Sequence, residues 1–272
     1  MKTRRMPLLL PVGMILLAWA VSSHAASVLV DLHANYNDPT PPPSGFTSDN
    51  NPPPVTQATG PVSDSLSHYT ASTNATASYG SLQTNVIIGT TTNDDSSIAT
   101  AKASWEDSLT IAGSGFGSVK FSFTFTGSLA ASGGGDSSVA QGNFNLSGNV
   151  NGNTFAHGGQ LHSSFGPTGE SPADFTTTNY LVNFGIPFTF NMTLENTASY
   201  VGSLAATSGS ASAAGFELTL TGIEVYDQFN TLISSPVISS ESGYVYGVPE
   251  PSRTLFVLLG TALLSQVRRR HR

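Results

Sequence analysis

The sequence predicts an all-β protein whose main body is an antiparallel, jelly-roll-like β-sandwich. Only 10% of the 272 residues are charged and none is cysteine, whereas 27 residues are glycine. Several segments alternate apolar and polar residues with the period of two that a strand with one buried face requires. Outside the two chain ends, no long segment has the 3.6-residue period of an amphipathic helix. A signal-peptide helix before this body and a short transmembrane helix after it complete the predicted architecture.

Residues 1–25 have the pattern of a cleavable signal peptide. A basic start is followed by an apolar run over residues 6–21, and then by small residues. Ser23 and Ala25 fit the −3 and −1 positions of a cleavage site, so we predict cleavage after Ala25. The alternative is an uncleaved membrane anchor. Prolines and a glycine interrupt the run, which is also short for a span of about 20 residues.

A proline-rich stretch follows the predicted cleavage site. Val28–Leu32 is a short β-like segment, but eight of the sixteen prolines then fall between residues 39 and 61. Proline has no backbone N–H and a fixed φ, so we expect this stretch to be an extended linker that cannot pair in a sheet. Residues 26–61 are therefore predicted to be a short strand and a linker, and residues 62–247 the β-sandwich.

The body contains several candidate strands, each bounded by glycine, asparagine or proline. Trp105 shares the register of Leu109 and Ile111, which favours a place in the core, and this segment ends at the glycine-rich turn 113–117. Strands that are apolar on one face need a second sheet to cover that face, which predicts a sandwich. The other candidates are residues 85–88, 119–125, 144–146, 180–184, 188–194, 216–220 and 223–226.

The last 25 residues, 248–272, form a distinct segment. Pro249, Glu250 and Pro251 precede an apolar run over Leu255–Val267, and the chain closes with Arg268, Arg269, Arg270 and Arg272. The run is short for a hydrocarbon core about 30 Å thick, but arginine snorkelling and local thinning can compensate. The positive-inside rule keeps the arginines in the cytoplasm and places the body across the inner membrane.

This order of elements resembles the PEP-CTERM sorting domain of exported proteins from Gram-negative, biofilm-forming bacteria. By that resemblance, Pro249, Glu250 and Pro251 form the sorting motif, the run that follows is a transient membrane helix, and the four arginines are the basic stop. The resemblance implies processing by a membrane-embedded exosortase, loss of the helix, and delivery to the cell surface or extracellular polymer. A plain C-terminal tail anchor is the alternative.

The charge distribution excludes one class of partner. Between residues 26 and 248 there are only two basic residues, Lys102 and Lys120, against sixteen acidic ones, a net charge of −14. Binding to nucleic acid depends on basic side chains that displace counterions from phosphates. We therefore predict no nucleic-acid partner.

Few residues suggest a catalytic or metal site. His157 and His162 could share a metal ion with Glu170 or Asp174, but the five-residue spacing and the lack of an H-E-x-x-H motif favour surface loops. No G-x-S-x-G motif marks a nucleophilic serine. We predict no catalytic residues and no metal.

Acidic pairs give a weaker signal for calcium. Asp94-Asp95 and Glu106-Asp107 are adjacent in sequence, whereas glycosidase carboxylates face each other across a cleft. The oxygen-rich segments at 93–95 and 135–136 could bind Ca²⁺, although solvated turns explain them more simply. We predict no cofactor, with Ca²⁺ as the one candidate.

These observations predict a non-enzymatic, exported protein that passes through the inner membrane and reaches the cell surface or extracellular matrix. We expect a structural or adhesive role there, in exopolysaccharide or biofilm, with extracellular polysaccharide as a candidate partner. Two alternatives stay open. A Ca²⁺-dependent carbohydrate-binding module would show bound Ca²⁺ and an aromatic row on one sheet. A secreted hydrolase would show a cleft in which His157 or His162 meets a serine and an aspartate.

Overall fold

The chain is all-β wherever its structure is described. The structure is a computed structural model that describes residues 26–35, 47–49, 55–64, 69–90, 96–133, 139–163, 166–201 and 209–247. These residues contain strands and turns but no helix, so none of them forms a helix that could cross a membrane. The predicted signal peptide with its cleavage site at Ala25 lies outside the described residues, as does the segment 248–272.

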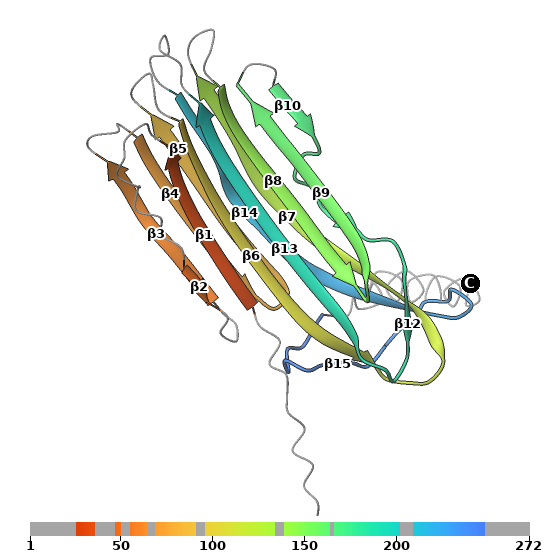
Figure 1. The fold of residues 1–272 in the computed structure, drawn as a ribbon. Coiled ribbons are helices and arrows are strands. Elements are labelled where there is room, and N and C mark those ends of the chain that lie inside the picture. The colour runs from red at the N-terminus through yellow and green to blue at the C-terminus, as the bar shows by residue number, and fades with distance from the viewer. Residues whose placement is uncertain are drawn as a thin grey trace, which may run out of the picture.

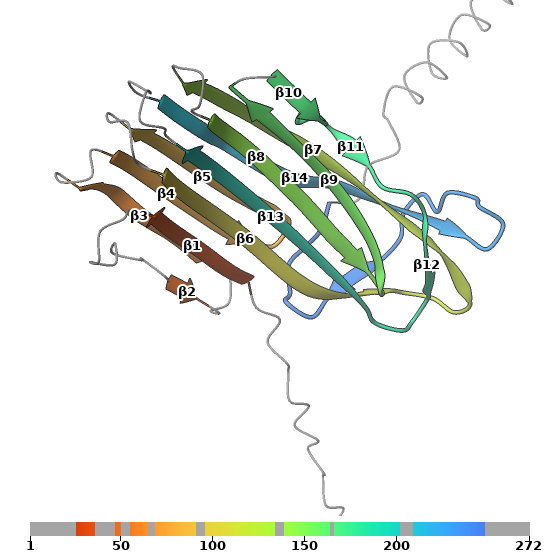
Figure 2. The same ribbon diagram turned by 45° about the horizontal axis from the view of Figure 1, so that its top comes forward.

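Two antiparallel sheets form the molecule and lie face to face (Figures 1 and 2). The first sheet has the order β10 (Gly166–Gly169), β9 (Asn153–His162), β8 (Val139–Val150), β13 (Phe188–Val201), β6 (Ser96–Ile111), β1 (Ala26–Asn35) and β2 (Thr47–Asp49), with β15 (Ile238–Ser240) also paired to β6. The second has the order β11 (Phe175–Thr176), β7 (Phe116–Gly133), β14 (Gly209–Asp227), β5 (Ser81–Thr90), β4 (Tyr69–Ser78) and β3 (Val55–Asp64), with β12 (Tyr180–Asn183) also paired to β7.

The inner faces of both sheets supply one hydrophobic core. Along β13, buried residues alternate with partly exposed ones from Phe188 to Tyr200, as expected for a strand with one covered face. Trp105 is only 2% exposed, so its predicted place in the core is confirmed. The predicted all-β, antiparallel, sandwich-like fold is confirmed, and each candidate strand of the body falls within a strand or at its end.

The proline-rich stretch differs from the prediction. β1 pairs with β6 along its whole length, β2 pairs with β1, and β3 pairs with β4. The expectation that residues 39–61 cannot pair in a sheet is therefore wrong for 47–49 and 55–61. The physical reason is local, because Pro61 falls where the register of β3 and β4 shifts, between Thr59 and Val62. A bulge leaves one residue out of the ladder, so a missing N–H costs little there.

A tight turn starts the strand that matters most for the candidate site. β8 and β9 pair from Val150 and Asn153, and Asn151-Gly152 forms the two-residue connection. Both turn residues have positive φ, 50° and 87°, as a type I′ hairpin turn requires. Asparagine and glycine are the residues that adopt this geometry at least cost. The turn fixes the register of β9 and the position of its first residues.

Candidate functional site: an edge cleft and a buried carboxylate

A cleft opens at one edge of the sandwich, between β9 and the segment that contains β11 and β12. This segment is held to the edge of β7 by two-way hydrogen bonding at Thr177. The Phe121 N–H donates to Thr177 Oγ1 at 3.0 Å, and the Thr177 N–H donates to the Phe121 carbonyl at 2.9 Å. Nearby, the Phe125 N–H donates to Asp174 Oδ1 at 3.1 Å. The far wall of the cleft is thereby fixed to the second sheet.

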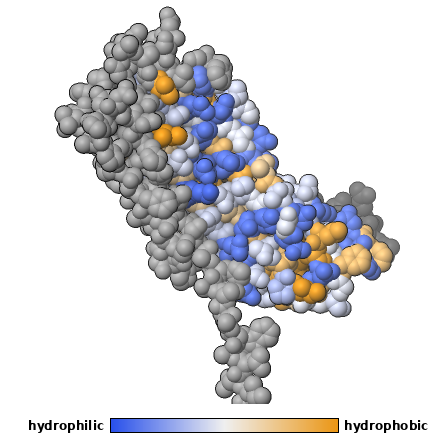
Figure 3. Space-filling model, viewed as in Figure 1, coloured by the Kyte–Doolittle hydropathy of each residue, from blue (hydrophilic) through white to orange (hydrophobic). Residues whose placement is uncertain are grey.

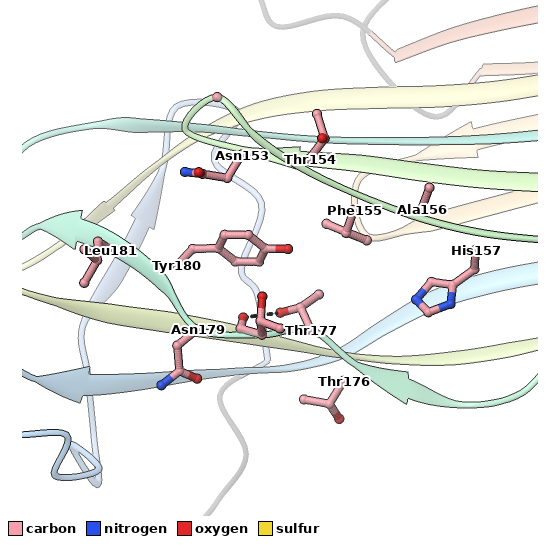
Figure 4. Close-up of a pocket in the computed structure, with 12 residues that line it drawn as sticks. Asn153, Thr154, Phe155, Ala156, His157, Thr176, Thr177, Asn179, Tyr180 and Leu181 are labelled. Carbon is pink, nitrogen blue, oxygen red and sulfur yellow. Dashed lines mark hydrogen bonds between the residues drawn. The ribbon is translucent and has the colours of Figure 1, made fainter.

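The cleft has a volume of about 950 Å³ and combines polar and aromatic side chains (Figure 4). The ring of Tyr180 lies between the two walls, with the ring of Phe155 beside it at a centroid distance of 6.1 Å. Hydroxyl and amide groups surround these rings. The lining residues are Gly152, Asn153, Thr154, Phe155, Ala156, His157, Thr176, Thr177, Thr178, Asn179, Tyr180 and Leu181.

A histidine–glutamate pair lies at one end of the cleft. His157 Nδ1 and Glu170 Oε2 are 2.7 Å apart, and the imidazole packs on the ring of Phe175 with centroids 4.3 Å apart. Both side chains are partly exposed, at 32% and 57%, so water screens the pair. The hydrogen bond through Nδ1 fixes the ring and leaves Nε2 for other partners.

A shared metal site would require the candidate ligands to lie close together in the structure. It brings His157 and Glu170 together, but as a hydrogen-bonded pair, while Asp174 accepts its bond from β7. No group of three potential ligands that could hold a metal ion occurs within the described residues. The candidate calcium segments 93–95 and 135–136 lie partly or wholly outside that part of the chain.

The cleft does not have the arrangement set out for a hydrolase. The side chains that line it beside His157 include threonines but neither a serine nor an aspartate. Thr177 Oγ1 is already engaged, because it accepts from Phe121 and donates to the Thr178 carbonyl at 3.0 Å. The pair with Glu170 would orient an imidazole base, but no hydroxyl group of the described residues is hydrogen-bonded to that base.

A second polar centre lies inside the sandwich at Asp107, which is fully buried on β6. Four bonds come from the C-terminal segment 238–247: Ser240 Oγ at 2.5 Å, Ser242 Oγ at 2.6 Å and Tyr246 OH at 2.7 Å donate to Oδ2, and the Ser242 N–H donates to Oδ1 at 3.3 Å. The Ser108 N–H adds a bond to Oδ1 at 2.8 Å. A carboxylate only accepts, so this set of donors suits its ionised form. We call this set of groups the Asp107 latch.

The latch changes the acidity of the tyrosines around it. Burial, followed by the hydrogen bond to Asp107 and the charge of that carboxylate, raises the pKa of Tyr246 well above its usual value. Burial and the same charge also raise the pKa of Tyr79. Removing a proton from either phenol would place a second negative charge near Asp107 in a site of low dielectric.

Sequence reasoning missed the latch, although part of the signal was present. Asp107 keeps the odd-numbered register of Trp105, Leu109 and Ile111, which points it inward, and an inward carboxylate needs donors. Its partners Ser240 and Tyr246 lie 133 and 139 residues further along the chain, where no local pattern marks them. For the cleft, the Asn151-Gly152 dipeptide was a usable hairpin signal.

Apolar side chains are exposed at the end of the sandwich that carries β12 (Figure 3). Leu181 pairs with Ser118 on β7, Ser118 pairs with Tyr226 on β14, and Tyr226 bridges to Leu232. Directly opposed residues share a face, so these side chains form one row. Other exposed apolar residues of the adjoining turns and of the C-terminal segment are Phe116, Ile186, Phe229, Val237, Tyr244 and Val245.

Comparison with known proteins adds no relative: no family model, no curated protein and no solved structure matches the chain.

Proposed function

We propose that the chain is an exported, non-enzymatic protein of a Gram-negative bacterium that reaches the cell surface or extracellular matrix, built on a jelly-roll-like β-sandwich and sorted through residues 248–272. The proposal depends first on three sequence elements in fixed order: the motif Pro249-Glu250-Pro251, the apolar run, and the arginine cluster. It depends second on the basic and apolar segment at the other end of the chain, which favours export.

The Asp107 latch supports the proposal because it holds the last described segment on the body. The latch's final donor is Tyr246, three residues before Pro249. A cut near Pro249 would therefore leave every bond of the latch in place. A body with this arrangement can lose its tail without losing its fold, as a sorting signal that is removed requires.

The exposed apolar end supports an intermediate held close to a bilayer. Val245 is 88% exposed, two residues before the end of the described segment, and Leu181 and Phe229 are 73% and 79% exposed. While the tail is in the membrane, a short connection of residues 248–254 spans at most about 25 Å. The proposal places this end of the sandwich at the membrane surface until the tail is cut.

Mass spectrometry of the full chain expressed in an exosortase-containing host, and in the same host lacking the exosortase, tests the proposal. We expect a mature N-terminus at Ala26 in both hosts. The C-terminus should lie near Pro249 only when the exosortase is present, with Arg268–Arg272 retained when it is absent. An intact C-terminus in both hosts would overturn the sorting proposal.

A pair of proline variants sharpens the same experiment. Pro249→Ala alters the motif and should leave the tail uncut in the exosortase-containing host. Pro236→Ala changes a proline of the β14–β15 loop, outside the motif, and should leave processing unchanged. Equal processing of both variants would show that the tripeptide is not the recognised element.

A further inference from the structure

We propose that the edge cleft between β9 and residues 176–181 binds a segment of a neutral polysaccharide. This proposal rests on the proposed function only for location, because an exported protein would meet polysaccharides outside the cell. The binding itself follows from the shape, polarity and charge of the cleft, and it is independent of the sorting tail.

The shape of the cleft suits an extended ligand. Its volume of about 950 Å³ is at the upper end of the range for small-molecule sites in proteins. One wall is the start of β9 and the other is a segment fixed to β7 by the bonds at Thr177. Both walls are therefore parts of paired strands or their connections, so the site exists before a ligand arrives. Preformed sites lose less entropy on binding.

The polar groups of the cleft can both donate and accept hydrogen bonds, as sugar hydroxyl groups do. Asn153 and Thr154 on one wall, and Thr176, Thr178 and Asn179 on the other, are exposed. The hydroxyl groups of Thr154, Thr178 and Tyr180 make no hydrogen bond to any described residue, which leaves them available to a ligand. A hydroxyl or amide group matches a sugar hydroxyl in either direction.

The aromatic rings supply the apolar surface that a sugar ring needs. Phe155 is partly exposed and offers its ring to the cleft, whereas Tyr180, whose ring is inclined by 36° to it, is only 6% exposed and backs that surface. A pyranose has a face of C–H groups that packs on such rings, while its hydroxyl groups point to the sides.

Charge decides between neutral and anionic ligands. His157 is the only ionisable side chain other than Tyr180 among the twelve lining residues, and Glu170 already occupies its Nδ1. No lysine or arginine lines the cleft to pair with a phosphate, a sulfate or a uronate group. The acidic body repels such polymers further. These observations favour a neutral glycan over a charged one.

Affinity electrophoresis of the full chain in detergent tests the proposal. The gels contain neutral β-glucan, α-glucan, galactan or mannan, with alginate and heparin as charged counterparts. We expect retardation by at least one neutral polysaccharide and by neither charged one. Retardation by none of the neutral polymers, or equal retardation by the charged ones, would overturn the proposal.

Three variants that remove single hydroxyl groups locate the binding site. Thr154→Val, Thr178→Val and Tyr180→Phe should each weaken binding about 5- to 10-fold, because each leaves a sugar hydroxyl without its partner. None of these hydroxyl groups bonds to a described residue, so the melting temperature should stay unchanged. Thr193→Val, on the outward face of β13, is the matched control and should bind like the parent chain.

Two results would move the site or change the ligand class. Unchanged binding by all three cleft variants would place the glycan elsewhere on the surface and refute the cleft. Capture of an unstructured peptide in place of glycans, with the same loss in the variants, would identify a peptide-binding edge. A chain that binds glycan but keeps its tail in cells would refute the sorting proposal alone, because the two measurements are separate.

Discussion

The two ends of the sandwich have different cores. At one end, which we call the aromatic end, the inward residues are Trp105–Ile111 of β6, Val119–Phe125 of β7 and Phe188–Met192 of β13. Phe190 packs there on Phe121 and Trp105, with ring centroids 4.0 and 4.9 Å apart. At the other, small-residue end, the inward residues include Ala99, Ala101 and Ala103 of β6, Asn196, Ala198 and Tyr200 of β13, and Ala211 and Ala213 of β14.

The difference shows in how closely the sheets approach. At the small-residue end, a Cβ atom on Gly142 of β8 would collide with the carbonyl oxygen of Ser212 on β14, in the opposite sheet. The sheets can pack this closely at Gly142 because glycine has no side chain and its partner on β13, Ala198, has a small one. Large rings bury more apolar area per residue than alanine, so the aromatic end contributes more to the hydrophobic free energy of folding. The latch and the cleft both adjoin that end.

The variant with the largest expected effect on stability removes the carboxylate at the centre of the Asp107 latch. We expect Asp107→Ala to lower the free energy of unfolding by about 3–5 kcal/mol, because it removes the acceptor that five donors share. Tyr246 OH and the Ser108 N–H have no second acceptor among the described residues, whereas the Ser240 and Ser242 groups can still bond to each other. Chemical denaturation followed by circular dichroism measures the loss. Amide exchange should also rise selectively in residues 238–247.

An exposed carboxylate on the neighbouring strand is the matched control. Glu195 forms an ion pair with Lys102 at 3.3 Å, and both side chains are 39% exposed. Glu195→Ala should cost at most about 1 kcal/mol. A loss for Asp107→Ala no larger than this would contradict the view that the latch anchors the C-terminal segment.

Residue patterns predicted the strands of both ends but not the interactions between distant segments. Alternation is a local property, so it located segments such as 119–125 and 188–194 and the inward direction of Trp105. The donors to Asp107 lie more than 130 residues away and could not be paired with it from one sequence. Proline content was misleading around β3, because a bulge at Pro61 accommodates the missing donor.

The same limit applied to the cleft. The sequence offered His157 and Glu170 as neighbours only within a metal site that it disfavoured, and the structure brings them within 2.7 Å as a hydrogen-bonded pair. Thr176–Thr178 and Tyr180 carry no motif, and they reach the cleft only because the segment pairs with β7. Which sheet edges face each other depends on the whole topology, which a single sequence does not specify.

The next largest effect on stability is expected where the two sheets approach each other closely, at Gly142. Gly142→Ala should destabilise the fold by about 2–3 kcal/mol, because the added methyl group meets backbone of the opposite sheet that cannot rotate away. Gly158→Ala on β9 is the control, since its added Cβ would lie 3.4 Å from the Phe144 carbonyl and needs little adjustment. Thermal unfolding compares the two. Equal melting temperatures would mean that the sheets are further apart at the small-residue end than described.

A smaller effect with a distinctive pH dependence is expected at Tyr246. Tyr246→Phe removes one bond to Asp107 and should cost about 1.5 kcal/mol at neutral pH. The pKa of Tyr246 is raised on folding, so its contribution is complete below pH 10 and is lost as the pH rises above that value. The parent chain should lose about 1.4 kcal/mol per pH unit there for this one group. Urea titrations between pH 9 and pH 11.5 measure the slope.

The phenylalanine variant should lack that part of the alkaline slope. Tyr244→Phe is the control, because Tyr244 is 46% exposed and its hydroxyl makes no hydrogen bond to a described residue. It should keep the neutral stability of the parent chain, which Tyr246→Phe lowers. A parallel slope in the Tyr246 variant would show that the alkaline loss comes from other groups.

The smallest effect is a gain of stability at the small-residue end. Asn196 is fully buried on β13, and neither its Oδ1 nor its Nδ2 has a hydrogen-bond partner among the described residues. Asn196→Leu removes two unpaired polar atoms at nearly constant size, so we expect a gain of about 1 kcal/mol in urea denaturation. Asn191→Leu, on the outward face of the same strand, should give no gain. A loss for Asn196→Leu would mean that the amide is hydrogen-bonded in solution, and that the small-residue end has a satisfied polar core.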